Sequence, residues 1–345
     1  MKQLTELATP FASVDTTLGN DVQWLKAQRL KALAVFNKQG LPSKKEEDWK
    51  YTSLWELSQQ EFTHQASEST VTAEQVEQAA LLGDSYRLVI ADGIFSAELS
   101  NLTNLPEGLF ICPLSSEQGL AKAQPHLGQQ VELAKAGFNA LNMLLMNDGY
   151  MIAVKAEAQI DKPIEVLVIN SGATQHLATH LRNVVVMEEN CKATLIEHYV
   201  GLSDAVSLTN VITEVVLSSD AELNHYKLQQ ESPNAFHIAT LSANQGRGSQ
   251  WNTSSIALGA KLARTDVQSK LVGQESHTTM DGLYIVTGEQ HVDHHTRIDH
   301  TVPNTTSEEL YKGVLDEQSH AVFNGKVIVH KDAQKTDANQ QNHNL

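Results

Sequence analysis

The second half of the chain repeats a pattern of short apolar strands separated by polar turns, and this repeat restricts the possible folds more than any other feature. Val, Ile and Leu are concentrated in segments such as 184–187, 211–217 and 267–272, and these residue types favour strands. Small residues follow the polar turns at steps of 30, 28, 27, 31 and 26 residues: Cys191, Ala221, Ser249, Ser276, Ser307 and Ala333. Each step of about 28 residues therefore holds two strands and two turns.

Two strands and two turns make one coil of a solenoid, in which each strand pairs with its copy in the next coil. A strand of five or six residues spans ~18 Å, at about 3.3 Å per residue. We therefore expect a mainly β chain, folded as a right-handed parallel β-helix with an N-terminal α-helical region. A jelly-roll sandwich is the alternative, because it also consists of short alternating strands, but the regular step favours the β-helix. Asn183 and Asn210 are candidates for a polar ladder between coils, with chance as the equal alternative.

The predicted domain boundaries follow the change from helical to strand periodicity. Residues 1–84 are predicted to form the N-terminal helical region, and residues 85–345 the β-helix core with a helical insertion at about 117–146. Apolar residues at helical spacing predict one helix over 21–38 and a shorter one over 73–82. We expect no further helix after the insertion.

Acidic residues outnumber basic residues, and cysteines are few. Asp and Glu total 41 against 25 Lys and Arg, which gives a formal net charge of −16. Nucleic-acid binding needs a basic surface, so this charge argues against a nucleic-acid partner and favours a basic one. Cys112 and Cys191 are the only cysteines, so no disulfide framework is implied and a cytoplasmic protein is expected. No apolar run approaches the ~20 residues of a membrane span, and we expect neither a signal peptide nor a membrane partner.

The most conspicuous candidate for chemistry is a cluster of histidines and aspartates near the end of the chain. Its members are His291, Asp293, His294, His295, Asp299 and His300. His and Asp are ligands for zinc and iron. Because side chains alternate along a strand, Asp293 and His295 are expected on one face and His294 on the other. Three interpretations stay open: a solvated or structural strand face, weak iron or zinc contact through His291, His294, His295 and His300, and a catalytic centre.

Two motifs at opposite ends of the chain carry a family resemblance. One reads Phe-Asn-Gly-Lys-Val-Ile-Val over 323–329 and continues with Ala-Gln-Lys-Thr-Asp-Ala over 333–338. The other combines Gly-Leu-Pro at 40–42 with Glu-Asp-Trp-Lys-Tyr-Thr at 47–52. Both are similar to motifs of the SufB/SufD family of iron-sulfur cluster assembly proteins, and the absence of a long cysteine-bearing insert favours the SufD branch. The aromatic residues of the N-terminal motif, Trp49 and Tyr51, are expected to anchor this region onto its neighbour.

The resemblance implies a non-catalytic scaffold subunit of the SUF complex, one that pairs with SufB, couples to the SufC ATPase and is linked to iron supply. It implies no tightly held cofactor, but transient iron or an iron-sulfur cluster at the interface with SufB. The family's C-terminal helical domain, which contacts SufC, is expected to be missing after Leu345, so no catalytic residue carries over to this chain. Pairing is predicted through the last strands, with SufB or in a homodimer.

Two alternatives come from other classes of protein. A β-helix that binds or modifies polysaccharides would need a basic groove, against which the acidic balance argues. A His-metal enzyme would be centred on residues 291–300. An enzyme is not expected, because the chain contains neither a phosphate-binding Gly-x-x-x-x-Gly-Lys-Ser/Thr loop nor a recognisable Ser or Cys nucleophile motif.

Overall fold

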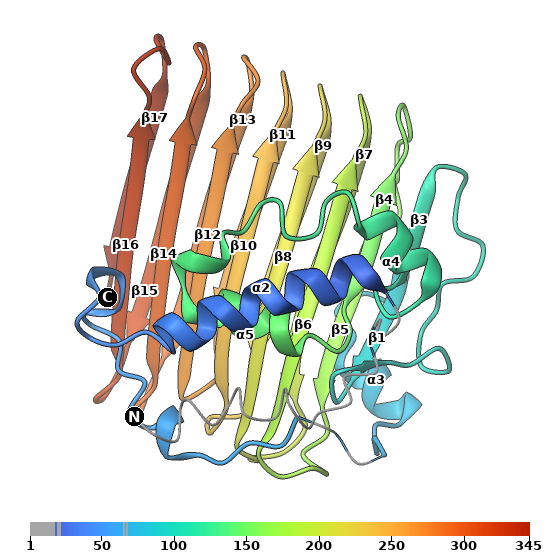
Figure 1. The fold of residues 1–345 in the computed structure, drawn as a ribbon, viewed down its shortest axis with the longest axis vertical. Coiled ribbons are helices and arrows are strands. Elements are labelled where there is room, and N and C mark those ends of the chain that lie inside the picture. Colours follow the sequence, from blue (N-terminus) through green and yellow to red (C-terminus); the bar gives the residue numbers. More distant parts are fainter. Residues whose placement is uncertain (1–17, 19–21, 65, 67) are drawn as a thin grey trace.

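Two parallel β-sheets wound from one solenoid make up most of the protein (Figure 1). The computed structural model describes residues 18, 22–64, 66 and 68–345. Within them, sheet A has eight strands in the order β16-β14-β12-β10-β8-β6-β4-β3, and sheet B has nine in the order β17-β15-β13-β11-β9-β7-β5-β1-β2. The strands are β1 Tyr86–Ala91, β2 Ile94–Phe95, β3 Leu109–Pro113, β4 Tyr150–Val154, β5 Ile164–Asn170, β6 Leu177–Met187, β7 Lys192–Gly201, β8 Ser207–Leu217, β9 Glu222–Gln230, β10 Phe236–Gln245, β11 Gln250–Ala257, β12 Leu262–Leu271, β13 His277–Val286, β14 His291–His300, β15 Thr306–Leu315, β16 His320–Val329 and β17 Asp337–Asn344.

From β4 onward the strands alternate between the two sheets, so each strand pairs in parallel with the strand two positions later in the chain. Leu177 of β6 lies opposite Ser207 of β8, and Leu262 of β12 lies opposite His291 of β14. Equivalent positions in neighbouring coils are therefore separated along the chain by close to the predicted step. The predicted parallel β-helix is confirmed, and the antiparallel sheets of a jelly roll are excluded.

The predicted asparagine ladder is wrong. Asn183 lies opposite Thr213, and Asn210 lies opposite His180. The reason is that the coil from β6 to β8 is longer than the stretch of chain from Asn183 to Asn210, so Asn210 falls short of the position opposite Asn183.

The turns that lead into sheet B confirm four of the six predicted corner residues and correct the last two. Small buried residues stand directly before β7, β9, β11 and β13: Cys191, Ala221, Ser249 and Ser276. The next two corners are Thr305 and Thr336, not Ser307 and Ala333. Both threonine hydroxyls donate to the carbonyl three residues earlier, as those of the two serine corners do. The turn before β7 spans residues 188–191, whereas the turn before β17 spans residues 330–336. Because the turns become longer, a nearly constant step from corner to corner misses the last two corners.

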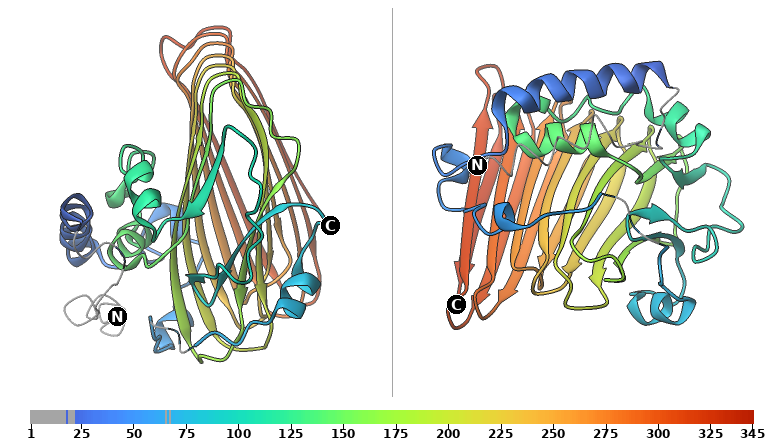
Figure 2. Two further views of the ribbon diagram at one scale, coloured as in Figure 1. Left: turned by 90° about the vertical axis from the view of Figure 1, so that its right-hand side faces the viewer. Right: turned by 60° about the horizontal axis from the view of Figure 1, so that its bottom comes forward.

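Helices form two further layers over the outer face of sheet A (Figure 2). The inner layer is α5 Gly137–Leu145, which is buried along its whole length and contacts β6 and β8. The outer layer is α2 Gln23–Gln39, which packs on α5 and confirms the helix predicted over 21–38. Shorter elements are η2 Glu47–Trp49, η3 Leu57–Gln59, α3 Ala73–Ala79, α4 Glu117–Ala123 and η4 Leu133–Lys135. In the described residues, no helix is long and apolar enough to cross a membrane.

Tyrosines and glycines interlock in the interior of the last coils. Gly282 of β13 lies opposite Tyr311 of β15, and Tyr284 lies opposite Gly313. A Cβ atom on Gly282 would lie 2.0 Å from the Tyr311 ring, and one on Gly313 would lie 2.0 Å from the Tyr284 ring. The two glycines therefore provide the space for two fully buried rings, which explains why glycine occurs in the middle of a strand here.

Candidate functional site

The predicted histidine cluster lies on β14, where its members divide between the inside and the outside of the solenoid. His294 and His300 are buried in the interior, whereas His291 and His295 lie with Asp293 on the outer face of sheet A. The predicted alternation is confirmed. Of the interpretation as a solvated or structural strand face, the solvated part is wrong for Asp293, His294 and His300, which are 0%, 1% and 0% exposed, because the interior and the N-terminal segment cover them.

Arg264 on β12 joins the outer-face residues into one network. Its guanidinium donates to Asp293 Oδ2 at 2.6 Å and to Asp266 Oδ1 at 2.9 Å. Asp293 Oδ1 in turn lies 3.0 Å from His295 Nε2. The side chain of Arg264 is 2% exposed, so this is a buried cation held between two carboxylates.

The segment between α2 and α3, residues 41–64, crosses sheet A from β16 back to β6, and we call it the strap (Figure 2). Trp49 anchors it, as predicted: the ring lies 5.7 Å from that of Phe138 and 4.0 Å from the guanidinium carbon of Arg264. The same prediction is wrong for Tyr51, which is 62% exposed. A buried aromatic residue stacked on a cation is therefore one anchor of the strap.

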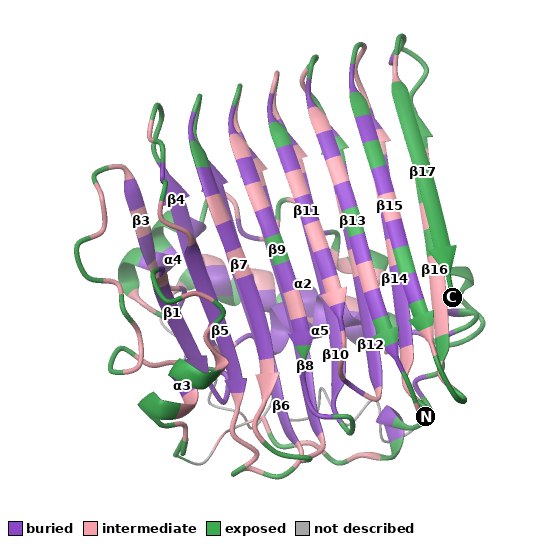
Figure 3. Cartoon of the chain, turned by 180° about the vertical axis from the view of Figure 1, so that it is seen from behind, coloured by how far each residue is buried: buried purple, intermediate pink, exposed green. Residues whose placement is uncertain are grey.

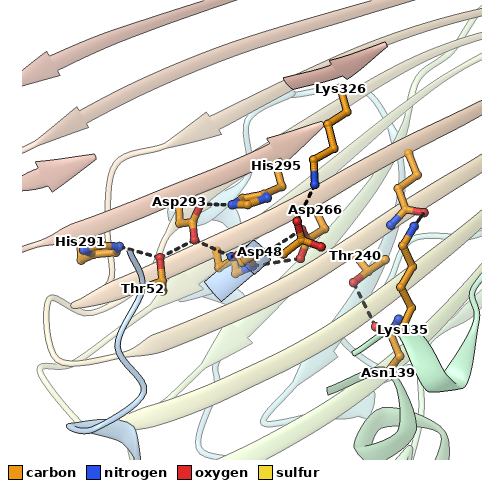
Figure 4. Close-up of polar contacts among 12 residues, drawn as sticks. Asp48, Thr52, Lys135, Asn139, Thr240, Asp266, His291, Asp293, His295 and Lys326 are labelled. Carbon is orange, nitrogen blue, oxygen red and sulfur yellow. Dashed lines mark hydrogen bonds and ion pairs between the residues drawn. The ribbon is translucent and has the colours of Figure 1, made fainter. Parts of the chain in front are cut away.

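Polar contacts fix the strap on either side of Trp49 (Figure 4). Asp48 Oδ1 lies 2.6 Å from Lys326 Nζ on β16. Thr52 Oγ1 donates to Asp293 and lies 3.0 Å from His291 Nε2. Two residues of the predicted cluster, His291 and Asp293, thus help to hold the strap.

Burial and charge act in opposite directions on the ionisable groups of this site. Burial raises the pKa of Asp293, but the hydrogen bond from His295 and the charge of Arg264 outweigh it, so the pKa lies below its ordinary value. Burial lowers the pKa of His291 to about 4 and that of His294 to about 3. Both imidazoles are therefore neutral at physiological pH, while Asp293 is ionised.

A polar cavity of about 160 Å³ opens between the strap, η4 and the outer face of sheet A. Its lining includes Asp48, Trp49, Lys135, Arg264, His295 and Lys326. Three of the cations lining it, Arg264, Arg297 and Lys326, are ion-paired, whereas Lys135 Nζ donates to the neutral amide oxygen of Gln268 at 3.2 Å. The arrangement suits a structural junction more than the binding of a charged ligand.

The four predicted metal-ligand candidates do not converge on one point. Both ring nitrogens of His300 are occupied, by the hydroxyls of Thr305 at 2.7 Å and Ser307 at 3.0 Å. His294 packs between the rings of two tyrosines. Among the residues with a described placement, no three His, Cys, Asp or Glu side chains are arranged to hold a metal ion. Iron or zinc contact at His291, His294, His295 or His300 stays a prediction.

The sequence analysis missed a second polar cluster inside the solenoid. Lys227 Nζ lies 2.7 Å from His237 Nε2, and His237 Nδ1 lies 2.6 Å from Glu231 Oε2. One coil away, Glu197 pairs with His225 at 2.9 Å and accepts hydrogen bonds from two buried tyrosines. Burial lowers the pKa of Lys227 to about 8. The sequence does contain a signal for part of this cluster: Glu197, His225 and Lys227 stand at every second position, in phase with the inward apolar residues of β7 and β9.

The last strand of each sheet, β16 and β17, has an outer edge without a strand partner in the described chain. Every residue of β17 is exposed (Figure 3). The N–H groups of Asp337 and Leu345 donate to carbonyls on the β15 side. Because N–H groups alternate along a strand, the N–H of Asn342 points to the open edge.

Comparisons with known proteins agree on one family. A family model for the SufBD core domain of the SUF system for FeS cluster assembly matches residues 168–345, and a model for the SufBD protein N-terminal region matches residues 1–166. An iron-sulfur cluster assembly SufBD family protein of Synechocystis is 30% identical, over 96% of this chain and 78% of the relative. The iron-sulfur cluster assembly protein SufD of Escherichia coli is 31% identical, over 89% of this chain and 70% of the relative.

Proposed function

Because the chain belongs to the SufBD family of iron-sulfur cluster assembly proteins and is SufD-like, we propose that it is a non-catalytic scaffold subunit of the SUF complex that pairs with SufB. The observation that carries the pairing is that β16 and β17 each have an outer edge with no strand partner among the described residues. The two edges lie at the same end of the solenoid, so one coil of a partner can extend both sheets at once.

The chemistry of the strands supports strand addition at this end. An exposed edge offers a row of unpaired N–H and C=O groups, which is a template for a further strand. At the other end of the solenoid the strands β2 and β3 pair antiparallel with their neighbours, so the parallel stack does not continue there. The end with the parallel edges is therefore the better partner surface.

In this proposal, iron or the nascent cluster is cargo that passes the SufB interface. A cluster held by thiolates alone needs up to about four cysteines. The chain has two, and Cys191 is a buried corner residue whose pKa is raised by burial to about 12. SufB would thus supply most of the ligands. Coupling to the SufC ATPase and a cytoplasmic location are part of the same proposal, and the family assignment speaks against a polysaccharide-binding protein or a His-metal enzyme.

The test is co-purification with SufB and SufC, using paired variants at Asn342. Asn342→Pro removes the outward N–H and preserves the bonds to β15, whereas Asn342→Ala removes only the side-chain amide. We expect the proline variant to lose SufB and the alanine variant to retain it, with unchanged circular dichroism in both. Retention of SufB by the proline variant would show that the edge of β17 is not the contact. Light scattering of the isolated chain separates a homodimer from a free monomer.

A further inference from the structure

The outer face of sheet B is bare beyond β7, in contrast to the covered face of sheet A (Figure 3). At the start of the sheet, α3 covers it by packing Val76 against Val89, Leu167 and Ile169. In the part of the chain that the structure describes, no helix lies over the sheet B strands β9, β11, β13, β15 and β17 (Figures 2 and 3). Most outward side chains there are polar, but a group of apolar ones gathers on part of this face.

We call this surface the outer apolar face, and it spans four neighbouring strands. Its residues are Tyr226, Leu228, Ile256, Leu283, Ile285, Leu310 and Val314. Leu228, Ile256 and Leu283 stand side by side on β9, β11 and β13. Tyr226, Ile285 and Val314 are 43%, 47% and 40% exposed. A continuous exposed apolar patch rimmed by polar residues is typical of a protein interaction site.

Two hollows flank a ridge formed by Leu283 and Leu310. One, of about 260 Å³, lies toward β11, and the other, of about 480 Å³, lies toward β17. They are offset by about one strand, ~5 Å, and about two residues along the strand, ~7 Å. Residues i and i+4 of a helix lie about 6 Å apart, and i and i+7 about 10 Å. Two apolar side chains on one helix face therefore match the two hollows.

Three charged groups at this surface have no ion pair in the described residues. Asp281 lines the hollow toward β11 and Lys312 lines both hollows, while Glu308 lies outside them, two residues before Leu310, which stands opposite Asp281. Partial burial and then the charge of Glu308 raise the pKa of Asp281, so these carboxylates repel each other and a cation between them would relieve the repulsion. Lys312 offers an acidic residue of the same partner a counter-charge.

We propose that the outer apolar face binds an amphipathic helix of a partner protein, with two large apolar residues in the hollows and a Lys or Arg at Asp281 and Glu308. A helix already packs in this way on the opposite face of the solenoid, where α5 covers sheet A with its axis across the strands (Figure 1). The site uses a sheet face and not the strand edges, so it goes beyond the proposed pairing with SufB and is independent of it.

The test uses a synthetic helical peptide with Leu at i, i+4 and i+7 and Lys at i+3, and a matched peptide with Glu in place of Lys. Binding to the full chain is measured by fluorescence anisotropy and located by hydrogen exchange. We expect the Lys peptide to bind and protect β11, β13 and β15. Leu283→Ser and Asp281→Asn should weaken binding by about tenfold or more, whereas Ile196→Ser, on the same face outside the hollows, should not.

Three results would overturn the proposal. One is the absence of binding at about 1 mM peptide, and another is equal binding of the Lys and Glu peptides. The third is a dimer, seen by light scattering, that Leu283→Ser converts to monomer, because the face would then be occupied by a second copy of the chain.

Discussion

Replacing Glu309 with Gln should stabilise the protein at neutral and alkaline pH and have little effect in acid. Glu309 faces the interior of the solenoid from β15 and is 3% exposed. Burial raises the pKa of its carboxyl from 4.5 to about 7, and the neighbouring Thr296 and Gln340 oppose this only in part. The native state therefore retains a proton over a pH range in which the unfolded chain has lost it.

The sign and the size of the effect follow from this difference in proton binding. The native state binds more protons between pH 4.5 and about 7, so the free energy of unfolding falls as the pH rises through this range. This difference in the pKa of Glu309 between the native and the unfolded state corresponds to about 3 kcal/mol of unfolding free energy. Gln has nearly the same shape and no charge, so the variant escapes this loss. We expect it to exceed the wild type by about 3 kcal/mol at pH ~8, and to equal it at pH ~4.5.

Urea-induced unfolding followed by circular dichroism, at several pH values between those limits, measures this difference. Other groups also titrate, but they do so in both proteins and cancel in the comparison. Glu289→Gln, at an exposed turn, is the control and should follow the wild type. A stability difference that is the same at every pH would attribute the effect to packing, and a variant less stable than the wild type at pH ~8 would refute the reasoning.

Three other predictions concern the strap and the core. Arg264→Ala leaves the buried carboxylate of Asp293 and the half-buried one of Asp266 without their cation, so it should cost about 3–5 kcal/mol and expose the strap to hydrogen exchange; Arg297→Ala, at a half-exposed pair, should not. Gly282→Ala places a methyl group against the Tyr311 ring and should lower the unfolding free energy by about 1–3 kcal/mol, measured by urea titration. Burial lowers the pKa of His64 to about 4, so the free energy of unfolding should fall as the pH drops from 6.5 toward 4, and His64→Gln should flatten this part of the profile.

The sequence by itself determined the architecture. Short runs of Val and Ile between polar turns, at a nearly regular step, specify stacked coils because backbone pairing and side-chain alternation are local properties of strands. The same alternation correctly separated His294 from Asp293 and His295. Small residues at the corners, such as Cys191, were also predictable, since the space inside a tight turn excludes larger ones.

Tertiary structure decided what the outward residues of each strand meet. Nothing near Arg264 in the sequence indicates that Trp49, more than two hundred residues earlier, lies on its guanidinium. The burial of Asp293 depends on the strap that crosses β14, whereas the outward positions of sheet B from β9 onward are half-buried or exposed. The register between neighbouring coils also depended on the tertiary structure. Because of the turn lengths, Asn210 does not lie opposite Asn183. Contacts between distant segments depend on how the layers stack, and a local pattern carries no information about that.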